Sequence, residues 1–131
     1  MITMIVTAVL FFSCKQNNTE FKERLTIADS AAINYFKGDG SMDTVILVKI
    51  IKDKNTLHQL TNLIADELIE EKPGCGYDGS LHFFKNNMVI QDIYFSMHNT
   101  DCSQFSFSFN RERTAAKLSA EAKKLLLNLK E

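Results

Sequence analysis

Hydrophobic residues recur with two different periods along most of the chain, and these periods predict a mixture of strands and helices. Short apolar or alternating segments at about 31–37, 44–51, 81–97 and 104–110 are typical of strands, and a further short strand is expected near 113–118. Leucine and isoleucine recur every three to four residues after Asp53 or Asn55 and again after Ser119, which predicts two capped helices. The order ββαβββα predicts an α+β fold, with an antiparallel sheet of about five strands and two helices packed on one face.

Three segments need a closer interpretation. Residues 21–37 fit either a helical face or a strand, and we favour a strand at about 31–37 entered from a short helix. The segment TVILVKII, residues 44–51, is apolar on both faces in its first half, which predicts an interior strand. The first helix is expected to end before Pro73 and to carry one apolar stripe, formed by Leu57, Leu60, Ile64 and Leu68.

The register of the hairpin within 81–97 depends on its turn. A two-residue turn at 86–87 pairs Phe83 with Ile90, whereas a three-residue turn at 85–87 pairs Phe83 with Val89. A slip of one residue moves every side chain to the other face, so we favour the three-residue turn, which gathers one apolar face from Leu81, Phe83, Val89, Ile93, Phe95 and Met97. Only Gln91 interrupts that face. The next strand, QFSFSFN, is expected to point Phe105, Phe107 and Phe109 inward.

The first twelve residues, MITMIVTAVLFF, are almost entirely apolar and follow neither period. As a helix they would be about 18 Å long, which is too short for a hydrocarbon core of about 30 Å but suits the apolar core of a secretory signal. With Leu10, Phe11, Phe12, Ser13 and Cys14, the run resembles the signal peptide of bacterial lipoproteins. In that family the cysteine thiol receives a diacylglyceryl group, the chain is cut just before the cysteine, and a fatty acid such as palmitate acylates the new amino group.

This resemblance implies a division of the chain and a location. Residues 1–13 would be a signal peptide, residues 14–24 a lipidated tether, and residues 25–131 a single α+β domain. Lipid on Cys14 implies a protein anchored in the membrane of the bacterial cell envelope. The absence of aspartate after the cysteine implies the outer membrane, with the domain facing the periplasm. Two other interpretations of the first twelve residues stay open: a signal without lipid, and a buried element of the domain.

The cysteine count is odd, which is unusual for an exported protein. If Cys14 carries lipid, Cys75 and Cys102 are the remaining pair, and an oxidising compartment would let them form a disulfide. The hairpin register places Cys75 at the open end of the hairpin, a short loop away from Cys102. Two separate buried thiols are the alternative, and a cysteine nucleophile beside His82 or His98 also stays open.

Composition narrows the classes of function. With 131 residues the chain has the length of one domain, and its net charge of -1 argues against a nucleic-acid partner, which would require a basic face. His58, His82 and His98 are scattered without the spacing of a zinc site, so neither metal nor cofactor is expected. No Ser-His-Asp order or paired-carboxylate motif is present, so the chain is not expected to be an enzyme.

Two regions are candidate binding sites. The stretch GCGYDG, which contains Tyr77 and Asp78, lacks the lysine and the following helix of a phosphate-binding loop, and is expected to be a turn around the disulfide. His82, Asp92 and Tyr94 are expected on the outward face of the sheet, and such a mixed polar and apolar face can either be a binding surface or lie under the amino-terminal segment. The sequence therefore favours a protein-binding module, such as an inhibitor or an accessory to an envelope complex, whose partner is another envelope or secreted protein. A small-ligand carrier or a weak hydrolase that uses GCGYDG is the alternative.

Overall fold

A computed structural model describes residues 15–38 and 44–131. In chain order the elements are α1 (Lys15–Thr26), β1 (Ser30–Phe36), β2 (Val45–Ile51), α2 (Lys54–Ile64), β3 (Leu68–Ile69), β4 (Gly79–Lys85), β5 (Met88–Ser96), η1 (Thr100–Cys102, a 3-10 helix), β6 (Gln104–Phe109), β7 (Glu112–Lys117) and α3 (Ala120–Lys130). The strands form one antiparallel sheet in the order β2-β1-β4-β5-β6-β7-β3. The predicted α+β class is therefore confirmed, although the described residues contain seven strands and three α-helices rather than about five and two.

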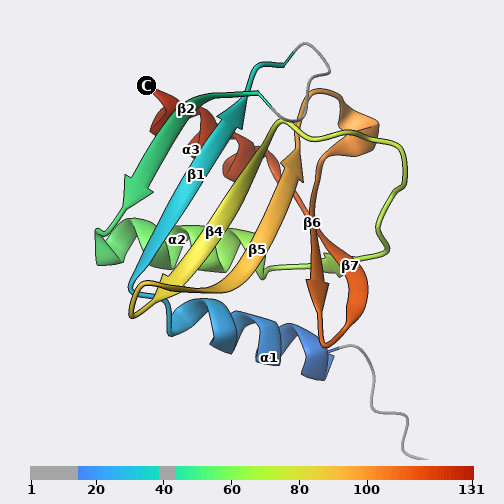
Figure 1. Cartoon of the computed structure of the whole chain (residues 1–131). Coiled ribbons are helices and arrows are strands. Elements are labelled where there is room, and N and C mark those ends of the chain that lie inside the picture. Colours follow the sequence, from blue (N-terminus) through green and yellow to red (C-terminus); the bar gives the residue numbers. More distant parts are fainter. Residues whose placement is uncertain (1–14, 39–43) are drawn as a thin grey trace, which may run out of the picture.

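The helices cover one face of the sheet. Figure 1 shows α2 and α3 behind the strands and α1 along the end of the sheet where β4 finishes. The other face, turned toward the viewer, carries no helix of the described chain. We call this second face the open face. It is the surface on which the strands present polar and apolar side chains in mixture.

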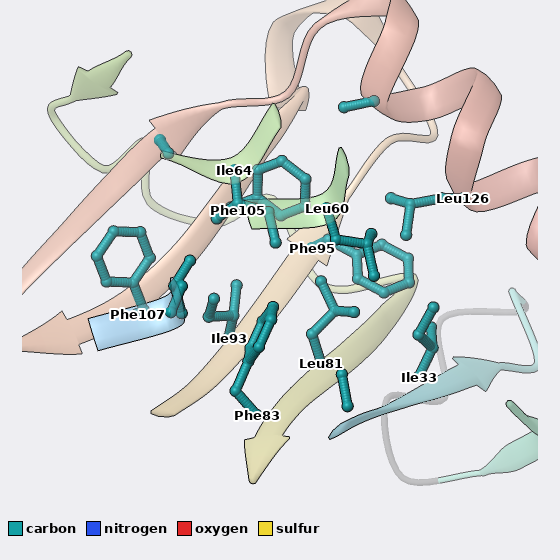
Figure 2. Packing of buried hydrophobic residues seen from close by; sticks show 14 of the residues in the cluster. Ile33, Leu60, Ile64, Leu81, Phe83, Ile93, Phe95, Phe105, Phe107 and Leu126 are labelled. Carbon is teal, nitrogen blue, oxygen red and sulfur yellow. The ribbon is translucent and has the colours of Figure 1, made fainter. Parts of the chain in front are cut away.

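The core lies between the sheet and the helices. Figure 2 shows strand residues such as Ile33, Leu81, Phe83 and Phe95 packed with Leu60, Ile64 and Leu126 of the helices. The inward orientation of Phe105, Phe107 and Phe109 is confirmed, since all three are buried. Tyr35 is also buried, and its hydroxyl donates to the Leu126 carbonyl at 2.6 Å, which links β1 to α3.

The amino-terminal boundary of the fold differs from the expectation. We expected residues 14–24 to form a tether, but Lys15–Thr26 forms α1, in which Phe21 and Leu25 are buried. These two residues are four positions apart and therefore share one helical face. The ring of Phe21 stacks on Phe107 with centroids 4.1 Å apart. Burial of a side chain of this size contributes about 1.5–3 kcal/mol, so α1 packs as part of the domain.

The prediction of an interior strand at 44–51 was wrong. Within residues 15–38 and 44–131, β2 lies at the edge of the sheet and pairs only with β1. The helices cover one face of β2, where Ile51 is buried, while the open face carries Val48 and Ile50 exposed. An apolar run on both faces of a strand shows which side chains are apolar but does not show whether anything covers them.

The helix predicted to reach Leu68 ends earlier. Its start is confirmed: Asp53 Oδ2 accepts from the backbone N–H of Thr56 at 3.0 Å. α2 stops at Ile64, and Leu68 then pairs with Ala116 of β7 as part of β3. The predicted cap of the last helix is also confirmed, since Ser119 Oγ accepts from the N–H of Ala122 at 3.1 Å.

The hairpin turn has two residues, so the favoured three-residue turn was wrong. Asn86 and Asn87 occupy the turn with φ of 51° and 64°, as a type I′ turn requires. Lys85 pairs with Met88 and Phe84 with Val89, after which a register shift at Ile90 pairs Phe83 with Gln91 and Leu81 with Ile93. The extra residue of this bulge restores the shared apolar face that the sequence requires. Val89 alone leaves that face and is exposed.

Candidate functional site on the open face

Four polar side chains lie side by side at the centre of the open face, and we call them the polar row: Asn34, Ser80, His82 and Asp92. Strand pairing brings them together, because Ser80 lies opposite Asn34 of β1 and His82 lies opposite Asp92 of β5. Ser80 and His82 are two residues apart on β4 and so point to the same face. The polar row therefore joins residues from three neighbouring strands.

The hydrogen bonds of the polar row define the state of His82. Its Nδ1 lies 2.6 Å from Asp92 Oδ1, and its Nε2 lies 3.0 Å from Ser80 Oγ and 3.2 Å from Asn34 Nδ2. A carboxylate only accepts and an amide nitrogen only donates, so neutral His82 carries its proton on Nδ1 and presents a lone pair at Nε2. Ser80 can then donate its hydroxyl proton to Nε2.

This connectivity, carboxylate to imidazole to hydroxyl, is the one that activates a serine in nucleophilic catalysis. Access to the serine is limited, however, because Ser80 is only 3% exposed. His82 is more open, and the side chain of Asp92 is 58% exposed. The solvent-facing part of the row therefore offers an imidazole and a carboxylate for contact with a partner.

The connector between β3 and β4, residues 70–78, packs over one end of the open face. The backbone of Lys72 exchanges two bonds with the side-chain amide of Gln104, at 2.9 and 2.8 Å. The ring of Tyr77 lies against Tyr94 of β5 with centroids 4.8 Å apart. Ser96 donates to the carbonyl of Gly76 and is fully buried. The connector thus covers the ends of β5 and β6 and leaves the polar row beside it.

Asp78 and the disulfide hold this connector in place. Asp78 Oδ2 accepts from the backbone N–H of Met97 at 2.6 Å and lies 3.0 Å from His98 Nδ1. Cys75 and Cys102 form the predicted disulfide, with Cα atoms 5.5 Å apart. The GCGYDG stretch is therefore a turn around the disulfide, as expected, and Asp78 has a structural role in it.

A cleft opens where β5 and β6 separate. The two strands pair only at Tyr94–Ser96, and beyond this point Gln91 inserts its side chain between them. Its amide nitrogen donates to the carbonyls of Asp92 and Ser108, both at 3.0 Å, and its oxygen accepts from Arg24 at 3.3 Å. This explains why Gln91 interrupts the apolar face: its side-chain amide forms hydrogen bonds with backbone carbonyls where β5 and β6 no longer pair. The cleft beside it has a volume of about 400 Å³.

The residues predicted as a binding surface fall into separate groups. His82 and Asp92 meet in the polar row, Tyr77 and Tyr94 pack together beside it, and Asp78 binds the backbone. Sequence reasoning missed Asn34 and Ser80. Ser80 could have been found from its spacing of two from His82, whereas Asn34 joins the row only through the pairing of β1 with β4. Cys14 and the predicted signal peptide lie outside the described residues.

Comparison with protein-family models, with curated proteins and with solved structures finds no match to this chain. Among the described residues, no helix is long and apolar enough to cross a membrane. The same residues contain no group of three or more His, Cys, Asp or Glu side chains placed to hold a metal ion.

Proposed function

We propose that the chain is an exported lipoprotein, anchored through Cys14, whose domain binds an extended segment of another exported protein at the β2 edge of the sheet. The observation that carries the binding proposal is the exposure of β2, where Val48 is 51% and Ile50 is 60% exposed. An edge strand also directs half of its backbone N–H and C=O groups away from the sheet, where an incoming strand can bond to them. Apolar contact and strand addition would then act together.

The side chains of β2 specify what the segment should look like. Residues facing Val48 and Ile50 should be apolar at alternate positions, since neighbouring strands present side chains to the same face with a period of two. Lys49 points to the other face, where it donates to the main-chain oxygen of Glu131 at 3.2 Å. If β2 of a second copy paired antiparallel with β2, with Val48 opposite Val48, the two Lys49 residues would be diagonal neighbours about 7–8 Å apart. The repulsion between their like charges opposes such a dimer. We therefore expect a partner segment that alternates apolar and acidic residues.

The anchoring part of the proposal rests on the resemblance of residues 1–14 to a lipoprotein signal. Two or three acyl chains are enough for stable anchoring, because each buried CH₂ contributes about 0.8 kcal/mol. Mass spectrometry of the membrane-extracted protein should find residues 1–13 removed and diacylglyceryl on Cys14. An intact Met1 with a free Cys14 thiol would contradict anchoring and leave the binding proposal untouched.

Substitution on β2 tests the binding proposal. Ile50→Lys places a charge in the exposed apolar stripe, and Ile27→Lys is the matched control, since Ile27, the residue that follows α1, is 57% exposed. A partner purified from solubilised membranes with the wild-type protein should bind Ile27→Lys equally and Ile50→Lys at least about tenfold more weakly, because roughly 1.5 kcal/mol of apolar contact is lost. Hydrogen exchange in the complex should show new protection of β2 amides.

Two results would overturn this assignment. Equal affinity of Ile50→Lys for the partner, with protection elsewhere, would move the binding surface away from β2. A dimer of the purified domain in light scattering that Ile50→Lys dissociates would assign the edge to self-association instead of partner binding.

A hydrolase is the second candidate function, and the polar row is the observation that favours it. Ser80 would be the nucleophile, His82 the base, and Asp92 the group that orients His82. A fluorophosphonate probe should then label the wild-type protein and fail to label Ser80→Ala. Absence of labelling in the wild-type protein would exclude this function, and the 3% exposure of Ser80 makes the binding module our first choice.

A further inference from the structure

We infer that the cleft between β5 and β6 binds a carboxylate attached to an apolar group. The cleft is independent of the β2 edge, because three strand spacings, about 14 Å, separate β2 from β5. Its volume of about 400 Å³ lies within the range of small-molecule sites. Its lining combines two guanidinium groups with apolar side chains, and each part predicts one feature of the ligand.

Arg24 is the anion-binding group of this site. It is half-buried, lies 4.5 Å above the ring of Phe109, and donates a hydrogen bond to Gln91. No carboxylate of the described residues pairs with it. A guanidinium group offers five donors in a planar fork that suits a carboxylate, and a partly buried cation gains most from such a partner. Phe109 and Gln91 fix the orientation of this fork at the cleft.

The other lining residues select a single negative charge and an apolar body. Arg113 adds a second guanidinium, but it is already paired with Glu71. Asp92 contributes a carboxylate that opposes a doubly charged group such as phosphate. The apolar part of the lining comes from Val89, Ile90, Tyr94 and Phe107. The ligand is therefore a monoanion, either a free organic acid or the carboxylate of a peptide.

Titration followed by amide NMR shifts tests this site. The probes are 3-phenylpropionate, a short acetylated peptide ending in phenylalanine, the amide of each, and inorganic phosphate. We expect saturable shifts at Gln91 and Ser108 with the two carboxylates, and at least about tenfold weaker binding of the amides and of phosphate. The tighter of the two carboxylates identifies the source of the ligand as free acid or peptide.

Substitutions separate this site from a general apolar cleft. Arg24→Gln should weaken carboxylate binding about tenfold or more, whereas Lys22→Gln, on the exposed side of the same helix, should leave it unchanged. Arg24 also packs on Phe109, so its replacement could alter the cleft itself. A second pair of variants leaves that packing intact, because Ser108 is exposed on the cleft wall. Ser108→Asp should block carboxylate binding by charge repulsion, and Ser108→Asn should not. Equal binding of acid and amide, equal binding of phosphate, or unchanged binding in both Arg24→Gln and Ser108→Asp would overturn the inference.

Discussion

Replacement of Gln91 tests whether this residue of β5 is a defect in an apolar face or a source of hydrogen bonds that the fold requires. By hydrophobic pattern alone, Gln91→Met completes the apolar face of the hairpin and should stabilise the domain by roughly 1 kcal/mol. In the structure, the same change leaves the carbonyls of Asp92 and Ser108 and the guanidinium of Arg24 without the bonds that the amide supplies. The two views predict opposite signs for the change in the free energy of unfolding.

The expected magnitude follows from these three bonds. Leaving a buried polar group unsatisfied costs about 1–3 kcal/mol, and the low end applies here because the adjoining cleft admits water. Three groups at about 1 kcal/mol each, less about 1 kcal/mol for the added apolar contact of methionine, give a net loss of about 2 kcal/mol. That is a large share of the 5–15 kcal/mol typical of a domain.

Equilibrium urea denaturation followed by far-UV circular dichroism measures the change, with the disulfide kept intact. Val89→Met is the control, since Val89 is an exposed residue of the same strand and its replacement should alter the free energy of unfolding by less than about 0.5 kcal/mol. In a double-mutant cycle, Arg24→Gln and Gln91→Met should couple by at least about 0.5 kcal/mol. A Gln91→Met protein as stable as the wild type, with an unchanged m-value, would refute the assigned role of Gln91.

Three further predictions concern the connector, a glycine and a helix cap. Opening the disulfide by Cys75→Ser and Cys102→Ser should lower the free energy of unfolding by roughly 3.5 kcal/mol for a separation of 27 residues, and a loss below about 1 kcal/mol in urea denaturation would contradict the chain-entropy account. Gly79→Ala should destabilise more than Gly74→Ala in thermal unfolding, because an added Cβ at Gly79 would come within 3.0 Å of the Phe95 ring and the Asn34 carbonyl, whereas at Gly74 it would meet no atom and would add only the strain of a side chain at a φ of 77°. Hydrogen bonds from the Thr56 side chain and backbone lower the pKa of Asp53 below its ordinary 3.8. The stability that ionised Asp53 gives the folded domain is therefore fully present above pH 3.8 and is lost as the pH falls through the pKa of Asp53 in the folded state. The difference in Tm between wild type and Asp53→Ala should therefore shrink between pH 6 and pH 2, and a constant difference would argue against the cap.

Local sequence determined the features that depend on near neighbours. The inward stripe of phenylalanines in β6 and the shared apolar face of the hairpin follow from periodicity over a few residues. The caps Asp53 and Ser119 follow from the residue type that precedes each helix. The Cys75–Cys102 pair followed from counting, once Cys14 was set aside for lipid. The two-residue turn did not follow, because a register shift at Ile90 achieved the same apolar face by another route.

Tertiary structure decided everything that depends on which strand lies beside which. β2 has the composition of an interior strand, yet the sheet order leaves it at the edge with Val48 and Ile50 exposed. Asn34 and His82 are 48 residues apart in the sequence and meet only because β1 pairs with β4. In the sequence, Gln91 interrupts an apolar face without an evident reason. In the structure, β5 and β6 separate beside it, and its amide donates to two backbone carbonyls there. Such contacts depend on the free energy of the whole folded domain rather than on any local segment. A local pattern can therefore indicate which side chains are apolar or polar, but not which residues they contact.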